Sequence, residues 1–225
     1  MTSPDAFVAQ LRALVDRRLA ELGETEALTF ESKGSLEIPV LLRLALKNEL
    51  EATEVAGRWL AGVSDSLPLA AELKLLLARQ AGDEAKHYGL IAARLRELDV
   101  DVTGWDPFRE NPRSPLYSFL LPLTDPVEQM AAGPFAREAL ACVKNQQFIA
   151  LCRKRGDVHT AALYERRIQP DESHHHELGA GMLRRLCVDE ASQARALAAV
   201  EKTLALADEL AEKARQKGIC RAPGC

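Results

Sequence analysis

Aromatic residues make up only 5% of this 225-residue sequence, and β-branched residues are also scarce. Alanine, leucine, glutamate and arginine dominate instead, and these residues favour helices over strands. Lysine and arginine total 29 against 33 aspartates and glutamates, for a net charge of −4, and no Lys/Arg-rich block stands out. The composition therefore predicts an all-α protein and gives no footprint for binding DNA or RNA.

Long apolar runs are also missing, because charged residues interrupt every stretch well before the ~20 residues that a membrane helix needs. The first ten residues lack a basic segment followed by an apolar one, so we expect no secretory signal. Five cysteines at irregular spacings favour reduced thiols. We expect a cytoplasmic protein without membrane contact. Cys220 and Cys225 either pair, bind a metal or remain free thiols in a mobile tail.

The length fits a single domain, 1–225. Apolar residues recur at helical spacing and predict six helices, over residues 4–22, 39–63, 68–98, 125–155, 157–187 and 189–218. A polar stretch, 23–35, separates the first two. Gly133–Pro134 is a candidate break in the fourth helix, and Pro170 should bend the fifth. Four central helices, within about 37–187, form the expected bundle.

Residues 99–125 differ in composition from the helical segments around them, since repeated prolines prevent any long regular element. A connection of this length in a helical bundle is usually a crossover between antiparallel helix pairs. Four aromatic residues, Trp105, Phe108, Tyr117 and Phe119, give it material for packing. The segment is therefore a candidate lid or substrate-facing wall.

Two short motifs repeat: Asp83-Glu84-Ala85-Lys86-His87 and Asp171-Glu172-Ser173-His174-His175. In each, Glu and His lie three residues apart, so both side chains of a helix can face one point. Each pair falls within an apolar helical stripe, where a hydrophobic residue would be expected. His176 competes with His175 for the second motif, but His175 repeats the spacing of His87.

Each of the other two central helices has one acid on its apolar face, Glu49 and Glu138. Glu49 precedes Glu84 by 35 residues, and Glu138 precedes Glu172 by 34. A half-motif is thus used twice: one Glu on a helix, then Glu-x-x-His on its antiparallel neighbour. Glu51 is the alternative to Glu49, although Glu51 and Glu54 fall on the predicted solvated face. Two such hairpins predict four Glu and two His converging inside a bundle.

Four buried carboxylates would be costly without cations, because each ion resists leaving water and like charges repel. Two divalent metal ions offset this cost. Mixed oxygen and nitrogen ligation suits iron or manganese, with Glu bridging and each His terminal, whereas structural zinc more usually has Cys and His ligands. We predict two iron ions, with manganese as the alternative.

These residues resemble the di-metal carboxylate proteins of the ferritin-like superfamily, such as rubrerythrins and the di-iron oxygenases. The run Asn48-Glu49-Leu50-Glu51-Ala52 is similar to the first-helix Glu region of rubrerythrins, and both repeats resemble the Asp-Glu-x-Arg-His motif of the oxygenases. Lys86 and His174 stand where that motif has Arg, and no rubredoxin-type Cys-x-x-Cys pair is present.

The resemblance implies a ferritin-like four-helix bundle with a long crossover, extended here by an N-terminal and a C-terminal helix. It also implies that Asp83 and Asp171 accept hydrogen bonds from the ligand histidines of the opposite motif. The implied metal ligands are Glu49, Glu84, His87, Glu138, Glu172 and His175.

The function expected from this site is a di-iron oxidoreductase that activates O2 or peroxide and draws on an electron donor protein or another reductant. Hydroxylation or oxidation of a small organic substrate or a modified nucleoside, as in a monooxygenase, is one form of it. The alternatives are a ferroxidase that handles iron and a metal-free helical binding module. The amphipathic last helix also makes a homodimer an expectation. Tyr164 and Trp59 are candidates for electron transfer, with core packing as the simpler interpretation.

Overall fold

The computed structural model describes residues 2–32, 37–110, 112–217 and 223, and every regular element among them is helical. Cys220 and Cys225, whose pairing or metal binding the sequence left open, lie outside the described residues. No described helix combines the length and the apolar character needed to span a membrane. The all-α prediction is confirmed.

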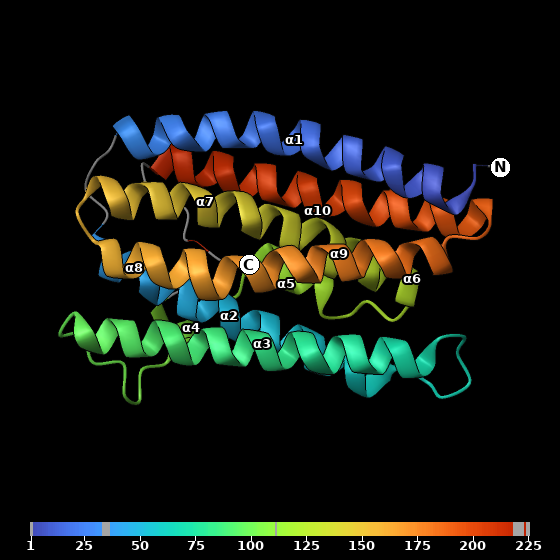
Figure 1. Cartoon of the computed structure of the whole chain (residues 1–225), viewed down its shortest axis with the longest axis horizontal. Coiled ribbons are helices and arrows are strands. Elements are labelled where there is room, and N and C mark those ends of the chain that lie inside the picture. Colours follow the sequence, from blue (N-terminus) through green and yellow to red (C-terminus); the bar gives the residue numbers. More distant parts are fainter. Residues whose placement is uncertain (1, 33–36, 111, 218–222, 224–225) are drawn as a thin grey trace.

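Two antiparallel helix pairs form the centre of the molecule. The first pair is α2 (Ile38–Gly62) and α3 (Ala70–Glu97), which pack against each other. The second pair has composite arms: α6 (Pro126–Met130), η1 (Ala131–Arg137) and α7 (Glu138–Lys154) form one, and α8 (Val158–Leu163), η2 (Tyr164–Ile168) and α9 (Gln169–Leu186) form the other. Figure 1 shows α2 and α9 running in one direction and α3 and α7 in the opposite one.

The segments η1 and η2 are π-helical turns, each of which directly precedes a helix that carries site residues. The candidate break at Gly133–Pro134 is instead part of η1. Pro170, where we expected a bend, lies in the first turn of α9, directly after η2. Proline lacks an N–H and clashes with the preceding turn of an α-helix, which a local π-turn relieves. The helix continues through both prolines, and Glu138 begins α7 directly after η1.

Aspartates define the starts of several helices in this half of the chain. Asp125 accepts a hydrogen bond from Val127 N at 2.7 Å, and Asp157 accepts one from Thr160 N at 2.9 Å. Asp189 accepts one from Ser192 N at 2.7 Å at the start of α10 (Glu190–Lys217). Each carboxylate satisfies a backbone donor that the first helical turn leaves free.

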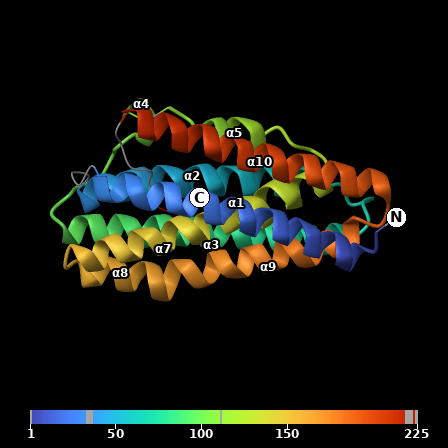
Figure 2. The same cartoon turned by 90° about the horizontal axis from the view of Figure 1, so that it is seen from above.

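The outer helices α1 (Pro4–Ser32) and α10 pack against each other and against the second pair (Figures 1 and 2). The predicted end of the first helix at residue 22 is wrong, because α1 continues through Gly23 into the polar stretch and ends at Ser32. A single glycine costs a helix only about 1 kcal/mol, and the glutamates, alanine and leucine after it are good helix formers. The predicted start of α1 at Pro4 agrees with the structure.

The crossover contains two short helices, α4 (Pro107–Glu110) and α5 (Pro115–Leu120), and each begins with a proline. Proline is favoured at this position because its fixed φ suits the first turn. Residues of α4 and α5 contact α2, and α5 also contacts α10. Figure 2 shows the crossover along the side of the bundle where α2 and α10 lie.

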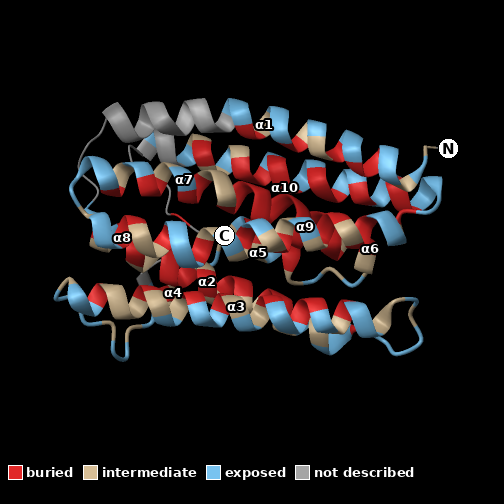
Figure 3. Cartoon of the chain, in the orientation of Figure 1, coloured by how far each residue is buried: buried red, intermediate tan, exposed pale blue. Residues whose placement is uncertain are grey.

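The hydrophobic core divides into two clusters. One contains Val55, Trp59, Leu77 and Phe135, together with residues of α1 and α10. The other contains Leu42, Leu46, Ile91, Phe148 and Tyr164. Along α2, Glu49 lies between Leu46 of one cluster and Val55 of the other, and along α3 Glu84 lies between Leu77 and Ile91. A polar layer of buried residues therefore separates two apolar layers. Figure 3 shows that the buried residues of the central helices lie toward the interior of the bundle.

Candidate metal centre

The six residues predicted as metal ligands meet in the polar layer between the two core clusters. Glu49 comes from α2, Glu84 and His87 from α3, Glu138 from the first turn of α7, and Glu172 and His175 from α9. Their donor atoms form two groups, in each of which all ligand atoms lie within 4.8 Å of one another. The groups are Glu49, Glu84, His87 and Glu172, and Glu84, Glu138, Glu172 and His175.

Glu84 and Glu172 belong to both groups and face both histidines. Oε2 of Glu84 lies 3.7 Å from Nδ1 of His87, and its Oε1 lies 3.9 Å from Nδ1 of His175. The oxygens of Glu172 lie 3.6 Å and 3.5 Å from the same two nitrogens. Ligand atoms each about 2.1 Å from one ion are at most about 4.2 Å apart, so these distances fit shared coordination. Glu84 and Glu172 are therefore placed where each could serve two ions.

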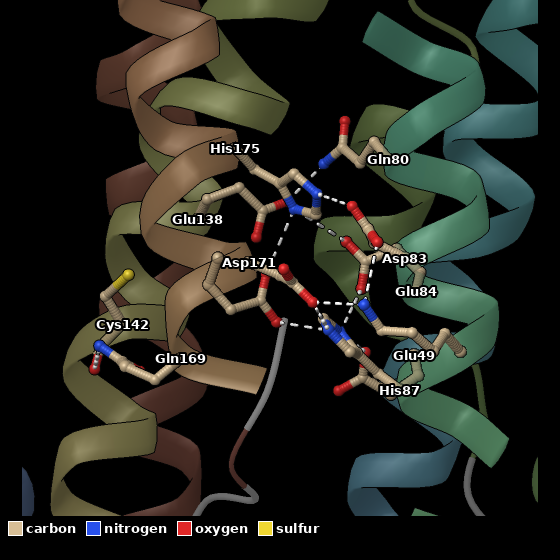
Figure 4. Close-up of polar contacts among 12 residues, drawn as sticks. Glu49, Gln80, Asp83, Glu84, His87, Glu138, Cys142, Gln169, Asp171 and His175 are labelled. Atoms are coloured by element: carbon tan, nitrogen blue, oxygen red, sulfur yellow. Dashed lines mark hydrogen bonds and ion pairs between the residues drawn. The ribbon is translucent and has the colours of Figure 1, made fainter. Parts of the chain in front are cut away.

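Glu49 and Glu138 each belong to only one group. Oε2 of Glu49 lies 3.5 Å from Nδ1 of His87. Glu138 accepts a hydrogen bond of 2.6 Å from Nε2 of Gln80 at the other end of the centre (Figure 4). The two halves therefore have the same composition: one terminal carboxylate, one histidine and two shared carboxylates.

Burial makes this arrangement costly for the protein alone. All four carboxylates and His87 are 0% exposed, and His175 is 1% exposed. Both oxygens of Glu49 and of Glu84, and Nδ1 of both histidines, lack a hydrogen-bond partner among the described residues. Buried polar atoms are nearly always satisfied, so carboxylate oxygens and imidazole nitrogens that lack such partners and converge on two points are suited to bind cations. The residues present therefore fit a pair of metal ions.

The pKa values of the cluster show the same need for positive charge. Burial raises the pKa of Glu49 to about 8, although His87 opposes the rise. Burial and the neighbouring Glu84 also hold the pKa of Glu172 well above its ordinary value. Burial would lower the pKa of His87, but the Glu49 and Glu84 carboxylates raise it to about 11. Without metal, the cluster therefore retains protons at positions where metal ions would otherwise supply the charge.

Glu84 is the exception, because its pKa is lowered to about 2. Burial by itself would raise that pKa, but His87 and the charge of Arg137 outweigh burial. Arg137 ends η1 and is only 5% exposed. The sequence analysis did not single out Arg137 or Gln80, although Gln80 precedes Glu84 by one helical turn on α3 and so lies on the same face.

Each histidine is held by an aspartate of the opposite motif. Nε2 of His87 donates to Oδ2 of Asp171 at 3.2 Å, and Nε2 of His175 donates to Oδ2 of Asp83 at 3.2 Å. These bonds orient Nδ1 of each ring toward the carboxylates, as Figure 4 shows. The pairing agrees with the expectation for Asp83 and Asp171, and such acceptors raise the basicity of a ligand imidazole.

His176, the alternative to His175, points elsewhere. Its Nδ1 donates to the backbone carbonyl of Phe135 at 2.7 Å, its ring stacks on that of Phe135, and Nη1 of Arg12 lies 3.3 Å from its Nε2. Phe135 belongs to η1. His176 therefore connects α9 to the π-helical turn before Glu138 and is not in either group of ligand atoms.

Glu51, the alternative to Glu49, is also outside the cluster. The prediction that Glu51 is solvated is wrong, since it is 6% exposed and accepts hydrogen bonds from Ser114 N and Oγ at 2.9 and 2.8 Å. Lys47 lies 3.1 Å from it. Glu54, also predicted to be solvated, is partly covered, because the Tyr117 hydroxyl donates to it at 2.9 Å. Both acids attach the crossover to α2.

Two hollows lie beside helices that carry the centre. Beside Arg137 and Asn48, the crossover residues Ser114, Leu116 and Tyr117 help to enclose a cavity of about 10 Å³, which holds about one water molecule. A larger groove of about 510 Å³ lies between α3 and α9 and is lined by Leu75, Leu178, Met182 and other residues. The crossover therefore forms a wall near the site but encloses little space.

The candidates for electron transfer have structural contacts. Trp59 is buried, donates from Nε1 to the Leu120 carbonyl at 3.1 Å and packs on Gly133. Tyr164 is 0% exposed and packs edge-on against Phe148, with ring centroids 4.9 Å apart. These contacts fit the core-packing interpretation of both aromatics.

Searches of protein-family models, of curated proteins and of solved structures find no match to this chain. The interpretation of the site therefore depends on the repeated motif and on the geometry of the buried cluster.

Proposed function

We propose that this protein is a di-iron oxidoreductase of the ferritin-like type that acts on dioxygen or hydrogen peroxide. The observation that carries the proposal is the pair of overlapping buried ligand groups, in which two carboxylates serve both halves. Four carboxylates balance two divalent cations, and the oxygen and nitrogen donors suit iron. A bound iron pair supplies two one-electron centres, which match the two electrons needed to reduce peroxide to water.

The protein's own residues would hold and protect such a pair. The Asp171 and Asp83 carboxylates keep a proton on Nε2 of His87 and His175, which leaves each Nδ1 free to bind metal. Gln80 orients Glu138 from the opposite side. The two apolar layers exclude bulk water, which strengthens electrostatic interactions within the layer.

The hollow between α2 and the crossover, which Arg137 also lines, is too small for a large substrate and favours a small oxidant. A space of about 10 Å³ accommodates a water-sized molecule. On this side, an organic substrate would require the crossover to move away from α2, against the contacts that Glu51 and Glu54 make with Ser114 and Tyr117. The crossover side therefore favours O2 or peroxide, whereas the groove of about 510 Å³ between α3 and α9 has room for an organic molecule.

The test is metal content and turnover of the full chain. Protein purified without chelator, or reconstituted anaerobically with ferrous ion, should contain about two iron atoms per chain, and its near-ultraviolet absorption should be lost in the Glu84→Ala/Glu172→Ala variant. The reduced protein should then consume O2 or peroxide with formation of the ferric pair. Glu51→Ala is the matched control, since Glu51 is a buried glutamate of the same helix as Glu49 but lies outside the cluster.

Absence of iron uptake would overturn the proposal in favour of a metal-free helical protein. Two manganese ions in place of iron would preserve the site and contradict the proposed reaction. Continued oxidation of many ferrous ions per chain, with a mineral product in a large assembly, would indicate iron handling instead.

A further inference from the structure

A single lysine joins the two halves of the candidate metal centre on its outer side. Lys86 belongs to α3, and its Nζ lies 2.6 Å from Oδ2 of Asp171 on α9 and 3.1 Å from Oδ1 of Asp83 on its own helix. Its side chain is 42% exposed, whereas those of Asp83 and Asp171 are 18% and 22% exposed. The two aspartates thus form a partly covered layer between this cation and the buried histidines.

Each aspartate accepts hydrogen bonds from Lys86 and from one histidine. Oδ2 of Asp171 accepts from both Lys86 and His87, so the two donors share one oxygen. Asp83 accepts from Lys86 through Oδ1 and from His175 through Oδ2. Arg79 also lies 3.6 Å from Asp83, but its side chain is 55% exposed. Among the residues that the structure describes, Lys86 is therefore the cation within hydrogen-bond distance of both carboxylates that face the ligand rings.

The two sequence motifs differ at the position of Lys86. The position of Lys86 in the first motif corresponds to His174 in the second, so the two motifs differ in the residue before the inner histidine. Yet the positive charge on α3 reaches the aspartates of both motifs. One side chain thereby acts on the two halves together.

Two physical effects of this charge have the same sign. A carboxylate that is partly neutralised by an ammonium group attracts the imidazole proton less, so the ring donates less electron density to a metal ion. The positive charge itself also favours the metal state with the lower charge. Both effects stabilise the ferrous over the ferric pair.

We propose that Lys86 is a positioning residue that raises the reduction potential of the metal pair through Asp83 and Asp171. This inference rests on the proposed function, since it requires iron bound by His87 and His175. It concerns the ease with which each ferric ion accepts one electron from an external reductant. It does not require Lys86 to touch the metal or the oxidant.

The experiment compares iron-loaded wild type with Lys86→Met and Lys86→Arg. The potential is measured by spectroscopic titration with dithionite in the presence of mediators, with one electron taken up per iron. We expect Lys86→Met to shift the equilibrium toward the ferric form by about tenfold, which is about 59 mV for a one-electron couple. Lys86→Arg, which keeps the charge, should remain close to wild type.

Lys74→Met is the matched control, because Lys74 is also on α3 and forms an exposed ion pair, in this case with Asp65, which does not face a histidine. It should leave the potential unchanged. Thermal unfolding followed by circular dichroism should show that all three variants fold, since removal of a surface ion pair costs at most about 1 kcal/mol.

Iron content, measured first, separates the two proposals. If the wild type binds no iron pair, the proposed function fails and this inference fails with it. If the pair binds but Lys86→Met has the wild-type potential, or a higher one, only the inference is overturned. Equal shifts in Lys86→Met and Lys86→Arg would also contradict it, because the charge would then not be the cause.

Discussion

Replacement of one buried carboxylate should stabilise the metal-free protein while it damages the metal site. The substitution is Glu49→Gln, which keeps the shape of the side chain and removes its ability to ionise. Glu49 is 0% exposed, and neither of its oxygens has a hydrogen-bond partner among the described residues. If Glu49 serves to bind metal, its buried carboxylate destabilises the folded protein whenever metal is absent.

The size of this destabilisation follows from the pKa of Glu49. In the unfolded chain its pKa has the ordinary value of 4.5, whereas burial raises the pKa to about 8 in the folded protein. Between these values the folded state retains a proton that the unfolded state has lost, which lowers the free energy of unfolding by about 1.4 kcal/mol per pH unit. The loss reaches about 3 kcal/mol at pH 7, and glutamine avoids it.

The assay is urea and thermal unfolding of chelator-treated protein. Glu49→Gln should raise the free energy of unfolding by up to about 3 kcal/mol at pH 7, or about 2–4 °C in Tm per kcal/mol for a chain of this size. The gain should become small near pH 5, because the unfolded Glu49 is then partly protonated as well. The variant should also bind less iron than the wild type.

Glu51→Gln serves as the control, since Glu51 already has Lys47 and Ser114 as partners. It should not stabilise the metal-free protein and should not lower its iron content. A less stable metal-free Glu49→Gln protein would refute the reasoning, because the carboxylate would then be satisfied by the fold itself.

Three further predictions concern pH, packing and the choice of histidine. The stability of the chelator-treated protein should fall as pH rises from about 4.5 to 8, because burial of Glu49 favours its protonated form and the unfolded chain loses that proton first. The difference in Tm between metal-loaded and chelator-treated protein should widen over the same range. Gly179→Ala should destabilise the protein by about 1–3 kcal/mol and reduce its iron content, since the added Cβ would lie 2.7 and 2.8 Å from backbone atoms of η1. Gly181→Ala is the control: its Cβ would meet nothing within 4 Å, so unfolding assays should find it neutral or stabilising. His175→Ala should halve the iron content measured by elemental analysis, whereas His176→Ala should retain both ions and lose stability; the reverse result would reassign the ligand.

The helical class and the approximate course of the chain were determined by the sequence alone. Apolar residues at helical spacing and a shortage of strand-forming residues leave few alternatives to packed helices. The capping acids Asp125, Asp157 and Asp189 start helices through contacts within three residues, so their effect is readable locally. The repeated Glu-x-x-His motif likewise depends only on helical periodicity.

Local pattern was insufficient where packing outweighed propensity. Gly23 and Pro134 were expected to interrupt helices, but α1 passes through the first and the π-turn η1 accommodates the second. The partners of Glu51 come from the crossover, which is far away in sequence, so its periodicity on α2 indicated solvent. These are effects of segments that meet only after folding.

Only the tertiary structure decided which polar atoms share a site. The choice of His175 over His176 follows from the rotation of α9 against η1, where the backbone carbonyl of Phe135 accepts a hydrogen bond from one ring and the carboxylates face the other. The reach of Lys86 to Asp171, and the presence of Gln80 at Glu138, depend on the distance between helices. A sequence shows which side chains one helix presents on one face, because its periodicity is local. It does not show the alignment between faces of different helices, because long-range packing determines that alignment.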